Sequence, residues 1–293
     1  MMNFKDKNDA YVLSNGVRIP CIGYGTYKTP ADDTGKAAVL SALSLGFRHI
    51  DTATSYHNEE MVGQAIAESG IPRSSLFITS KLWNDDQGYE ETLAAFERSC
   101  RWLGTDYLDL YLIHWPICPG YQDNWHERVW GTWKAFEKLY SDGVIRAIGV
   151  SNFLPHHLDA LAQKATQKAN VLPMVDQLEL NPSYQQRGAV RYCQEHNIQL
   201  EAWAPLVRGK AFSNQQLKDI ADRQGKDVGQ VCVRWSLQKG FLPLPKSIHP
   251  ERVKSNAEVF DFSLSDEEMA MLDAMNTTTE YTFHPDYCDE WFK

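Results

Sequence analysis

Four side chains that can exchange or stabilise protons follow the ends of short apolar runs: Asp51, Tyr56, Lys81 and His114. A buried lysine is costly unless a carboxylate compensates its charge, and Asp51 is the available partner. An ammonium group beside a phenol stabilises the phenolate, so we expect Lys81 to lower the pKa of Tyr56 from its usual value of about 10. Tyr56 could then act as a general acid near neutral pH, while His114 orients a substrate oxygen. Each residue alone is more often a packing or surface residue, so the hypothesis requires all four to converge.

A second chemical feature is a small group of cations in a chain whose formal net charge is −9. Lys246 and Ser247 end an apolar run, and Arg252 follows at the predicted start of a helix. The N-terminus of a helix attracts anions through its free N–H groups and its dipole, and arginine offers a planar fork to phosphate oxygens. The segment therefore predicts a phosphate site, with a solvated surface cluster as the alternative.

Short apolar runs alternate along the chain with segments whose apolar residues have helical spacing. The runs that read as strands lie at Ile22, His49–Asp51, Leu76–Thr79, Leu108–His114, Ile145–Ser151, Met174–Gln177, Leu200–Trp203 and Phe241–Leu244. Such alternation predicts an α/β protein with a parallel sheet, and eight units in 293 residues predict a single (β/α)8 TIM barrel. The ends of its strands would bring the four proton-exchanging residues to one face.

The two ends of the chain have different signals. Asn15-Gly16 between β-prone runs predicts an N-terminal β-hairpin with a type I′ turn. Residues 276–293 form an aromatic-rich tail, which we expect to act as a C-terminal substrate loop over the active site; a disordered acidic tail is the alternative. No linker-like stretch divides the chain, so one domain over residues 1–293 is expected.

The composition, with 43% hydrophobic and 23% charged residues, is typical of a soluble globular protein. The negative charge and the lack of a basic stripe argue against nucleic acid as a partner. Six scattered cysteines, without the spacing of a zinc site, read as reduced thiols, so we expect a cytoplasmic protein without a bound metal. No apolar run has membrane-spanning length, and we expect a monomer that acts on a small molecule.

Three segments, together with Lys81 and His114, give the chain a family resemblance. They run from Gly46 to Gly63, from Arg146 to Phe153, and from Leu244 to Asn256. In this order they resemble the three signatures of the aldo-keto reductases. Trp203, where many animal members have tyrosine, is similar to the bacterial branch that includes diketogluconate and glyoxal reductases.

The resemblance implies an NADPH-dependent oxidoreductase that reduces aldehydes or ketones, such as small carbonyls, α-dicarbonyls or keto-sugars, to alcohols. Tyr56 would be the proton donor, tuned by Lys81 and Asp51, with His114 orienting the carbonyl. The implied cofactor-binding residues are Gly25, Thr26, Tyr27, Asp51, Ser151, Asn152, Gln177, Trp203, Ala204, Pro205, Leu206, Lys246, Ser247, Ile248, Arg252 and Asn256. Of these, Trp203 would stack on the nicotinamide, and Lys246, Ser247 and Arg252 would bind the 2′-phosphate. Ser255 departs from the family pattern, because many members have Glu immediately before this Asn.

Aromatic residues near the strand ends are the candidates for a substrate pocket. They are Tyr27, Tyr56, Trp83, His114 and Trp115, and Trp125 is a further candidate. Two other functions are compatible with the same residues. Lys81 could form a Schiff base in an aldolase-type lyase, or the barrel could be a non-catalytic nucleotide-sensing subunit.

Overall fold

The computed structural model describes residues 4–165, 171–277 and 284–287. Within them, eight parallel strands form one sheet in the order β10-β9-β8-β7-β6-β5-β4-β3. These strands are β3 (Tyr24–Gly25), β4 (His49–Asp51), β5 (Phe77–Leu82), β6 (Leu108–Ile113), β7 (Ile145–Ser151), β8 (Val175–Glu179), β9 (Gln199–Trp203) and β10 (Leu242–Pro243). Each lies at or beside one of the eight apolar runs, which confirms the predicted strands.

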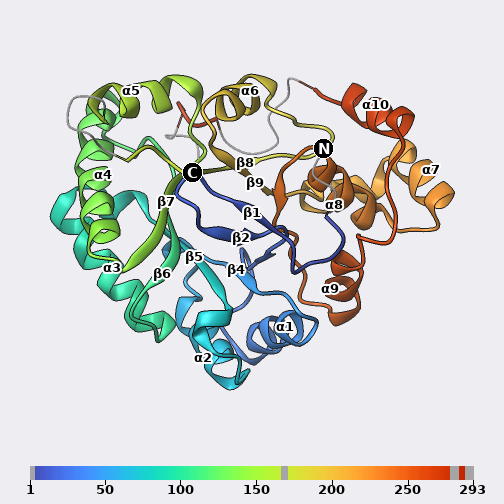
Figure 1. Cartoon of the computed structure of the whole chain (residues 1–293), viewed down its shortest axis with the longest axis horizontal. Helices are drawn as coiled ribbons and strands as arrows, with labels where there is room; N and C mark the ends of the chain where they lie inside the picture. The colour runs from blue at the N-terminus through green and yellow to red at the C-terminus, as the bar shows by residue number, and fades with distance from the viewer. Residues whose placement is uncertain (1–3, 166–170, 278–283, 288–293) are drawn as a thin grey trace.

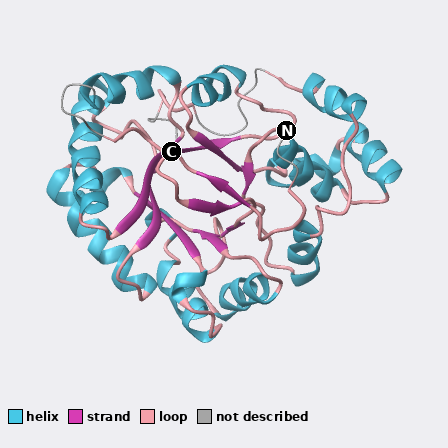
Figure 2. Cartoon of the chain, in the orientation of Figure 1, coloured by secondary structure: helices cyan, strands magenta, loops and turns pink. Residues whose placement is uncertain are grey.

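Backbone hydrogen bonds also join the first and last strands of this order. The N–H groups of Gly23 and Gly25 donate to the carbonyls of Pro243 and Pro245 at 3.1 and 3.2 Å. Glycine is needed at position 23 because a Cβ there would lie 2.6 Å from Cδ2 of Leu244. The sheet thus curls back on itself as a (β/α)8 barrel, with its strands inside a ring of helices (Figure 2).

The helices cover the outer face of the sheet (Figure 1). They are α1 (Asp33–Ser44), α2 (Glu59–Glu68), α3 (Tyr89–Leu103), α4 (Trp125–Ser141), α5 (Pro155–Ala165), α6 (Arg187–Glu195), α7 (Gln215–Gln224), α8 (Val228–Gln238), α9 (Pro250–Ala257) and α10 (Asp266–Ala274). Every residue of β5 and β6 is buried, because one face of each strand packs against helices and the other against the barrel interior.

The N-terminal hairpin is present, but its turn differs from the prediction. Strands β1 (Ala10–Val12) and β2 (Arg18–Pro20) pair antiparallel, with Tyr11 opposite Ile19. The predicted type I′ turn is wrong, because only Gly16 of the Asn-Gly pair has positive φ, at 85°. The carbonyl of Leu13 accepts a hydrogen bond from the N–H of Gly16, and the N–H of Leu13 donates to the carbonyl of Val17. The loop is therefore longer than the two residues of a type I′ hairpin turn.

The hairpin covers the end of the barrel where the strands begin. The Tyr11 hydroxyl donates to the carbonyl of Phe241, just before β10, at 3.0 Å, and Asn15 Nδ2 donates to the carbonyl of Arg146 in β7 at 2.9 Å. This end is therefore closed by side chains, and a cavity can open only where the strands end. In the described part of the chain, no helix has the length and apolar character needed to cross a membrane.

Candidate active site

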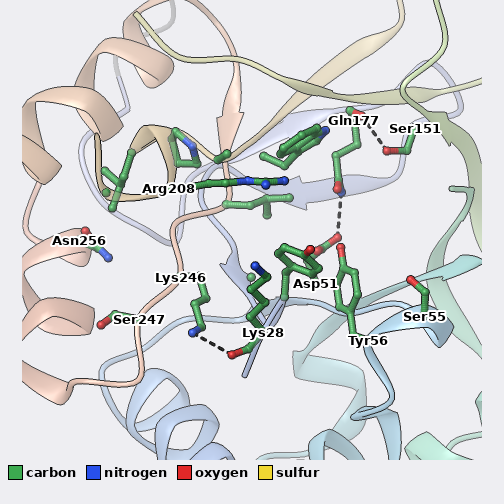
Figure 3. A pocket seen from close by; sticks show the side chains of 18 of the residues that line it. Lys28, Asp51, Ser55, Tyr56, Ser151, Gln177, Arg208, Lys246, Ser247 and Asn256 are labelled. Atoms are coloured by element: carbon green, nitrogen blue, oxygen red, sulfur yellow. Dashed lines mark hydrogen bonds between the residues drawn. The ribbon is translucent and has the colours of Figure 1, made fainter. Parts of the chain in front are cut away.

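A cavity of about 1310 Å³ lies where the strands end. Every one of the eight barrel strands contributes a residue to the cavity lining, either from the strand itself or from the position directly after its last residue. These residues are Gly25, Asp51, Trp83, His114, Ser151, Gln177, Trp203 and Leu244. The predicted convergence of strand ends therefore produces the cavity, and Figure 3 shows the side chains that enter it.

Lys81 lies at the centre of a buried polar cluster below the cavity. Its Nζ is 2.7 Å from both carboxylate oxygens of Asp51, 3.0 Å from the carbonyl of Thr52 and 3.3 Å from the hydroxyl of Tyr56. Burial alone would lower the pKa of Lys81, but the charges of Asp51 and Tyr56 and the hydrogen bonds to them raise it overall. Lys81 therefore stays protonated, with its donors directed at these acceptors.

The protonated state of Lys81 also bears on the Schiff-base alternative. An amine must lose its proton before it can attack a carbonyl carbon. Here the ammonium is fully buried and is held by Asp51 and Thr52. The geometry suits a residue that tunes its neighbour and opposes its use as a nucleophile.

Tyr56 differs from the prediction in the direction of its pKa shift. Burial raises the pKa of Tyr56 to about 12, although the Lys81 ammonium acts in the opposite direction. The predicted net decrease is wrong, because the loss of water around the hydroxyl outweighs the nearby cation. Tyr56 thus keeps its proton at neutral pH, as a donor must.

A short turn holds Tyr56 beside Lys81. It is the 3-10 helix η1 (Thr54–Tyr56), which leads from β4 to α2 and ends at His57 with φ of 53°. Asn58 ties this turn to the barrel, because its Nδ2 donates to the carbonyls of Thr26 and Thr29 and its Oδ1 accepts from Thr52. The position of the phenol is therefore set by a buried hydrogen-bond network.

His114 follows β6 and faces Tyr56, with their ring centroids 5.7 Å apart. Its Nδ1 is 3.3 Å from the hydroxyl of Ser55, and Trp83 packs edge-on against the imidazole at 5.2 Å. Burial, with a smaller effect of Lys81, holds the pKa of His114 well below its usual value. The ring is therefore neutral at pH 7, and it can donate one hydrogen bond and accept another.

Aromatic side chains wall this part of the cavity. Tyr27, Trp83 and Trp115 all line it together with Tyr56 and His114. The remaining candidate, Trp125, packs edge-on against His157 at 4.9 Å and is not among the lining residues.

Polar groups on β7 and β8 border the central part of the cavity. Asn152 Nδ2 donates to the carbonyl of His114 and its Oδ1 accepts from Nε1 of Trp203, both at 3.0 Å. The Ser151 hydroxyl donates to the backbone carbonyl of Gln177 at 2.8 Å. These bonds fix the indole of Trp203 and the polar side chains of Ser151 and Asn152 in the cavity that Tyr56 also lines.

Cations lie toward the other end of the cavity, on and before α9. Lys246 donates to the carbonyl of Lys28 at 3.2 Å, and burial, followed by the charge of Lys28, lowers the pKa of Lys246. Ser247, Arg252 and Asn256 also line this end. The predicted phosphate-binding residues therefore line the same cavity, and Figure 3 shows Lys246, Ser247 and Asn256 among its side chains.

Some predicted cofactor residues lie elsewhere, and some lining residues were not predicted. Thr26 is buried, donates to the carbonyl of Asp51 and, like Ile248, is not among the residues that line the cavity. Arg208 is an unpredicted lining residue, whose guanidinium carbon lies 5.8 and 5.7 Å from the ring centroids of Tyr27 and Trp203. Further unpredicted lining residues are Lys28, Thr54, Ser55, His57, Gly209, Phe212, Asp227, Leu244 and Ser255.

Asp227 is the most informative of these residues, because it lies beside the position where the chain departs from the family pattern. The Ser255 hydroxyl donates to the carboxylate of Asp227, which also caps α8. Many family members have Glu at the position of Ser255. Here the carboxylate of Asp227, held by Ser255, brings a negative charge to the same part of the cavity lining.

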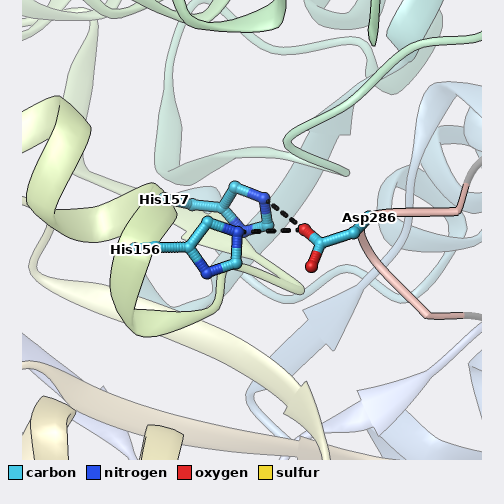
Figure 4. Close-up of side chains that lie close together, drawn as sticks. All are labelled: His156, His157 and Asp286. Atoms are coloured by element: carbon cyan, nitrogen blue, oxygen red, sulfur yellow. Dashed lines mark hydrogen bonds and ion pairs between the residues drawn. The ribbon is translucent and has the colours of Figure 1, made fainter.

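The described part of the tail contacts α5. Asp286 Oδ1 is 3.0 Å from Nε2 of His156 and 2.9 Å from Nε2 of His157 (Figure 4). His157 Nδ1 accepts from the N–H of Leu154, so its neutral ring has a proton on Nε2 and no free lone pair for a metal. The cluster therefore suits attachment of the tail. Residues 278–283 and 288–293 of the tail lie outside the described residues.

Residues 21–277 match the model of the Aldo/keto reductase family. The chain is 49% identical over 278 residues to glyoxal reductase of Bacillus subtilis (strain 168), covering 95% of this chain and 96% of that protein. It is 45% identical over 277 residues to 9,11-endoperoxide prostaglandin H2 reductase of Trypanosoma cruzi (strain CL Brener), with 94% of each covered. Among solved structures, a Bombyx mori aldo-keto reductase in complex with NADP has a TM-score of 0.86 and 33% identity, with 97% of both chains covered.

Proposed function

The chain belongs to the aldo/keto reductase family, and we propose that it reduces small aldehydes, ketones, α-dicarbonyls or keto-sugars to alcohols with Tyr56 as the proton donor. Its membership makes it an NADP-dependent reductase. The name of the Bacillus subtilis relative supports α-dicarbonyls such as glyoxal as first substrates to test.

The cavity has groups that suit each part of NADPH. Its centre offers the indole of Trp203 and the polar side chains of Ser151 and Asn152, which suit a nicotinamide ring and its carboxamide. Its far end offers Lys246 and Arg252, which suit the extra phosphate of NADPH. When bound, NADPH would supply the hydride that reduces the carbonyl carbon.

The contact between Lys81 and Tyr56 is the observation that carries this proposal. As the substrate oxygen gains negative charge, Tyr56 donates its phenolic proton to that oxygen. The Lys81 ammonium, 3.3 Å from the phenol oxygen, stabilises the phenolate that remains. Asp51 keeps Lys81 charged, and the neutral His114 donates a hydrogen bond that orients the carbonyl.

Tyr56→Phe tests this proposal, because it removes the acid and keeps the ring. The variant should bind NADPH as the wild type does and lose roughly 10²–10⁴-fold in kcat, the usual contribution of general acid catalysis. The measurement is NADPH oxidation with glyoxal, simple aldehydes, keto-sugars and ketones. A Phe variant with wild-type kcat would exclude Tyr56 as the donor, and a wild type that binds NADPH without turnover would favour the nucleotide-sensing alternative.

We further propose that the whole chain acts as one domain, with the tail from residue 276 serving as a substrate loop. Asn276 Oδ1 accepts from the N–H of Gln185, in the connection after β8, at 2.9 Å. Asp286 contacts His156 and His157 at the start of α5, which follows β7. Both attachments lie on the side of the barrel where the strands end, and this supports a tail that crosses near the cavity.

A further inference from the structure

The side-chain amide of Gln177 lies between two buried carboxyl groups beneath the cavity. Its Nε2 is 2.8 Å from Oδ2 of Asp51 and 2.8 Å from Oε2 of Glu201. Because Asp51 is paired with Lys81 and ionised, only the amide nitrogen can face it; an amide oxygen would repel it. Both N–H groups of Gln177 are thus engaged, and its amide oxygen is the atom left to interact with a ligand in the cavity that Gln177 lines.

Glu201 is fully buried in the middle of β9, and among the described residues no lysine or arginine forms an ion pair with it. Its Oε1 has no hydrogen-bond partner among the described residues; the closest basic group is Nε2 of His49, 3.8 Å away. His49 cannot supply a charge, because burial, followed by the charge of Lys81, lowers its pKa to about 3. The Lys81 ammonium is already held by Asp51.

The groups around Glu201 act in opposite directions on its charge, since the hydrogen bond from Gln177 and the charge of Lys81 favour the ionised form, while burial and Asp51 favour the protonated form. The neighbouring strands present Gln177 on β8 and the apolar Leu242 on β10. Asp51 and His49 on β4 and Lys81 on β5 approach Glu201 from strands that do not pair with β9. Burial, followed by the negative charge of Asp51, raises the pKa of Glu201 to about 8. Glu201 is therefore mostly uncharged at neutral pH, and it loses its proton as the pH rises through that value.

We propose that Glu201 is a positioning residue of the reductase, which in its uncharged form orients the Gln177 amide toward the cofactor. This inference rests on the proposed function. It also predicts how activity depends on pH, because a negative charge on Glu201 would oppose formation of the phenolate at Tyr56. Ionisation of Glu201 should therefore lower kcat/KM on the alkaline side of the pH profile.

Two variants of Glu201 separate this role from simple packing. Glu201→Gln keeps the shape and an acceptor for Gln177 but cannot ionise, so NADPH affinity should stay close to that of the wild type. The alkaline fall in kcat/KM should then move to higher pH. Glu201→Ala removes the acceptor and leaves a Gln177 N–H unpaired, which should weaken NADPH binding roughly five- to a hundred-fold.

Asp176→Asn is the matched control. Asp176 is a buried carboxyl that directly precedes Gln177 on β8, and its pKa is also raised by burial. Successive side chains of a strand point to opposite faces, and Oδ2 of Asp176 contacts Sγ of Cys193 on α6, on the face away from the Gln177 side chain. This variant should keep both the NADPH affinity and the pH profile of the wild type.

The readouts are the NADPH Kd from fluorescence titration, the unfolding temperature without cofactor, and kcat/KM between about pH 6 and pH 10, which brackets the pKa of about 8. Wild-type NADPH affinity in Glu201→Ala, or an unchanged alkaline limb in Glu201→Gln, would overturn the proposal. If Glu201→Ala does not fold, the pH profile of Glu201→Gln decides. If the wild type reduces no carbonyl, the proposed function fails, while NADPH titration of the variants still tests the role of Glu201.

Discussion

Replacing Lys81 with methionine tests the central electrostatic contact of the site. In the wild type, 3.3 Å separates its ammonium from the phenol oxygen of Tyr56, and at an effective dielectric near 20 a unit charge at that distance contributes about 5 kcal/mol to a full phenolate. The transition state develops only part of that charge. Since each 1.36 kcal/mol changes a rate about tenfold, part of this energy corresponds to a decrease in kcat of roughly 10²–10³-fold for Lys81→Met.

The same substitution should also affect folding, because Asp51 would remain buried without its partner. Removing one member of a buried ion pair typically costs about 3–5 kcal/mol. The double variant Lys81→Met with Asp51→Asn removes both charges, so its unfolding temperature should recover while kcat stays low. Circular dichroism during heating measures the unfolding temperature, and NADPH oxidation with glyoxal measures kcat.

A matched control separates this effect from a general loss of positive charge in the cavity. Lys246→Met removes a cation from the far end, so it should weaken NADPH binding and leave kcat at saturating cofactor near the wild-type value. A folded Lys81→Met variant, or a folded double variant, with wild-type kcat at pH 7 would refute the assignment of Lys81 as the group that stabilises the phenolate.

Two further predictions concern the cofactor and the tail. Arg252→Ala should weaken NADPH roughly ten- to a hundred-fold and NADH much less, since a hydrogen bond to a charged group contributes about 1.5–3 kcal/mol; equal losses in fluorescence titrations would make Arg252 structural. Asp286→Ala removes the contacts with His156 and His157, so it should reproduce the effect of deleting residues 280–293. Both changes should alter KM and the ranking of carbonyl substrates while NADPH affinity is kept, and unchanged kinetics for every carbonyl would exclude a substrate loop.

The barrel could be predicted from the sequence because parallel strands buried on both faces are continuous apolar runs between helical segments. The turn of the hairpin could not be predicted in the same way. Asn15-Gly16 has the local preference for a two-residue turn, but the pairing of Tyr11 with Ile19 leaves room for a longer loop. Tertiary contacts of the hairpin, such as that of Tyr11 with Phe241, set the register, and the turn adapts to it.

The positions of the proposed acid–base residues were predictable because barrel strands end on one face. The missed lining residues belong to connections whose shape depends on unusual backbone angles. Arg208 has φ of 52° and precedes Gly209 with φ of 89°, and this kink turns the guanidinium over Trp203. Asp227 lines the cavity and accepts a hydrogen bond from Ser255, a residue that is distant from it in sequence. No local pattern predicts either placement.

The pKa shifts were the least predictable property of the site, because they depend on how deeply each titratable group is buried. The sequence suggested that Lys81 lowers the pKa of Tyr56, yet burial makes the net shift upward. The two effects act at different stages of the proposed reaction. Burial keeps the proton on Tyr56 until a carbonyl oxygen is ready to accept it, and Lys81 then stabilises the phenolate that forms, so the site favours the transition state over the resting enzyme. Glu201 follows the same logic, since a buried acid that holds its own proton adds no negative charge to oppose that phenolate.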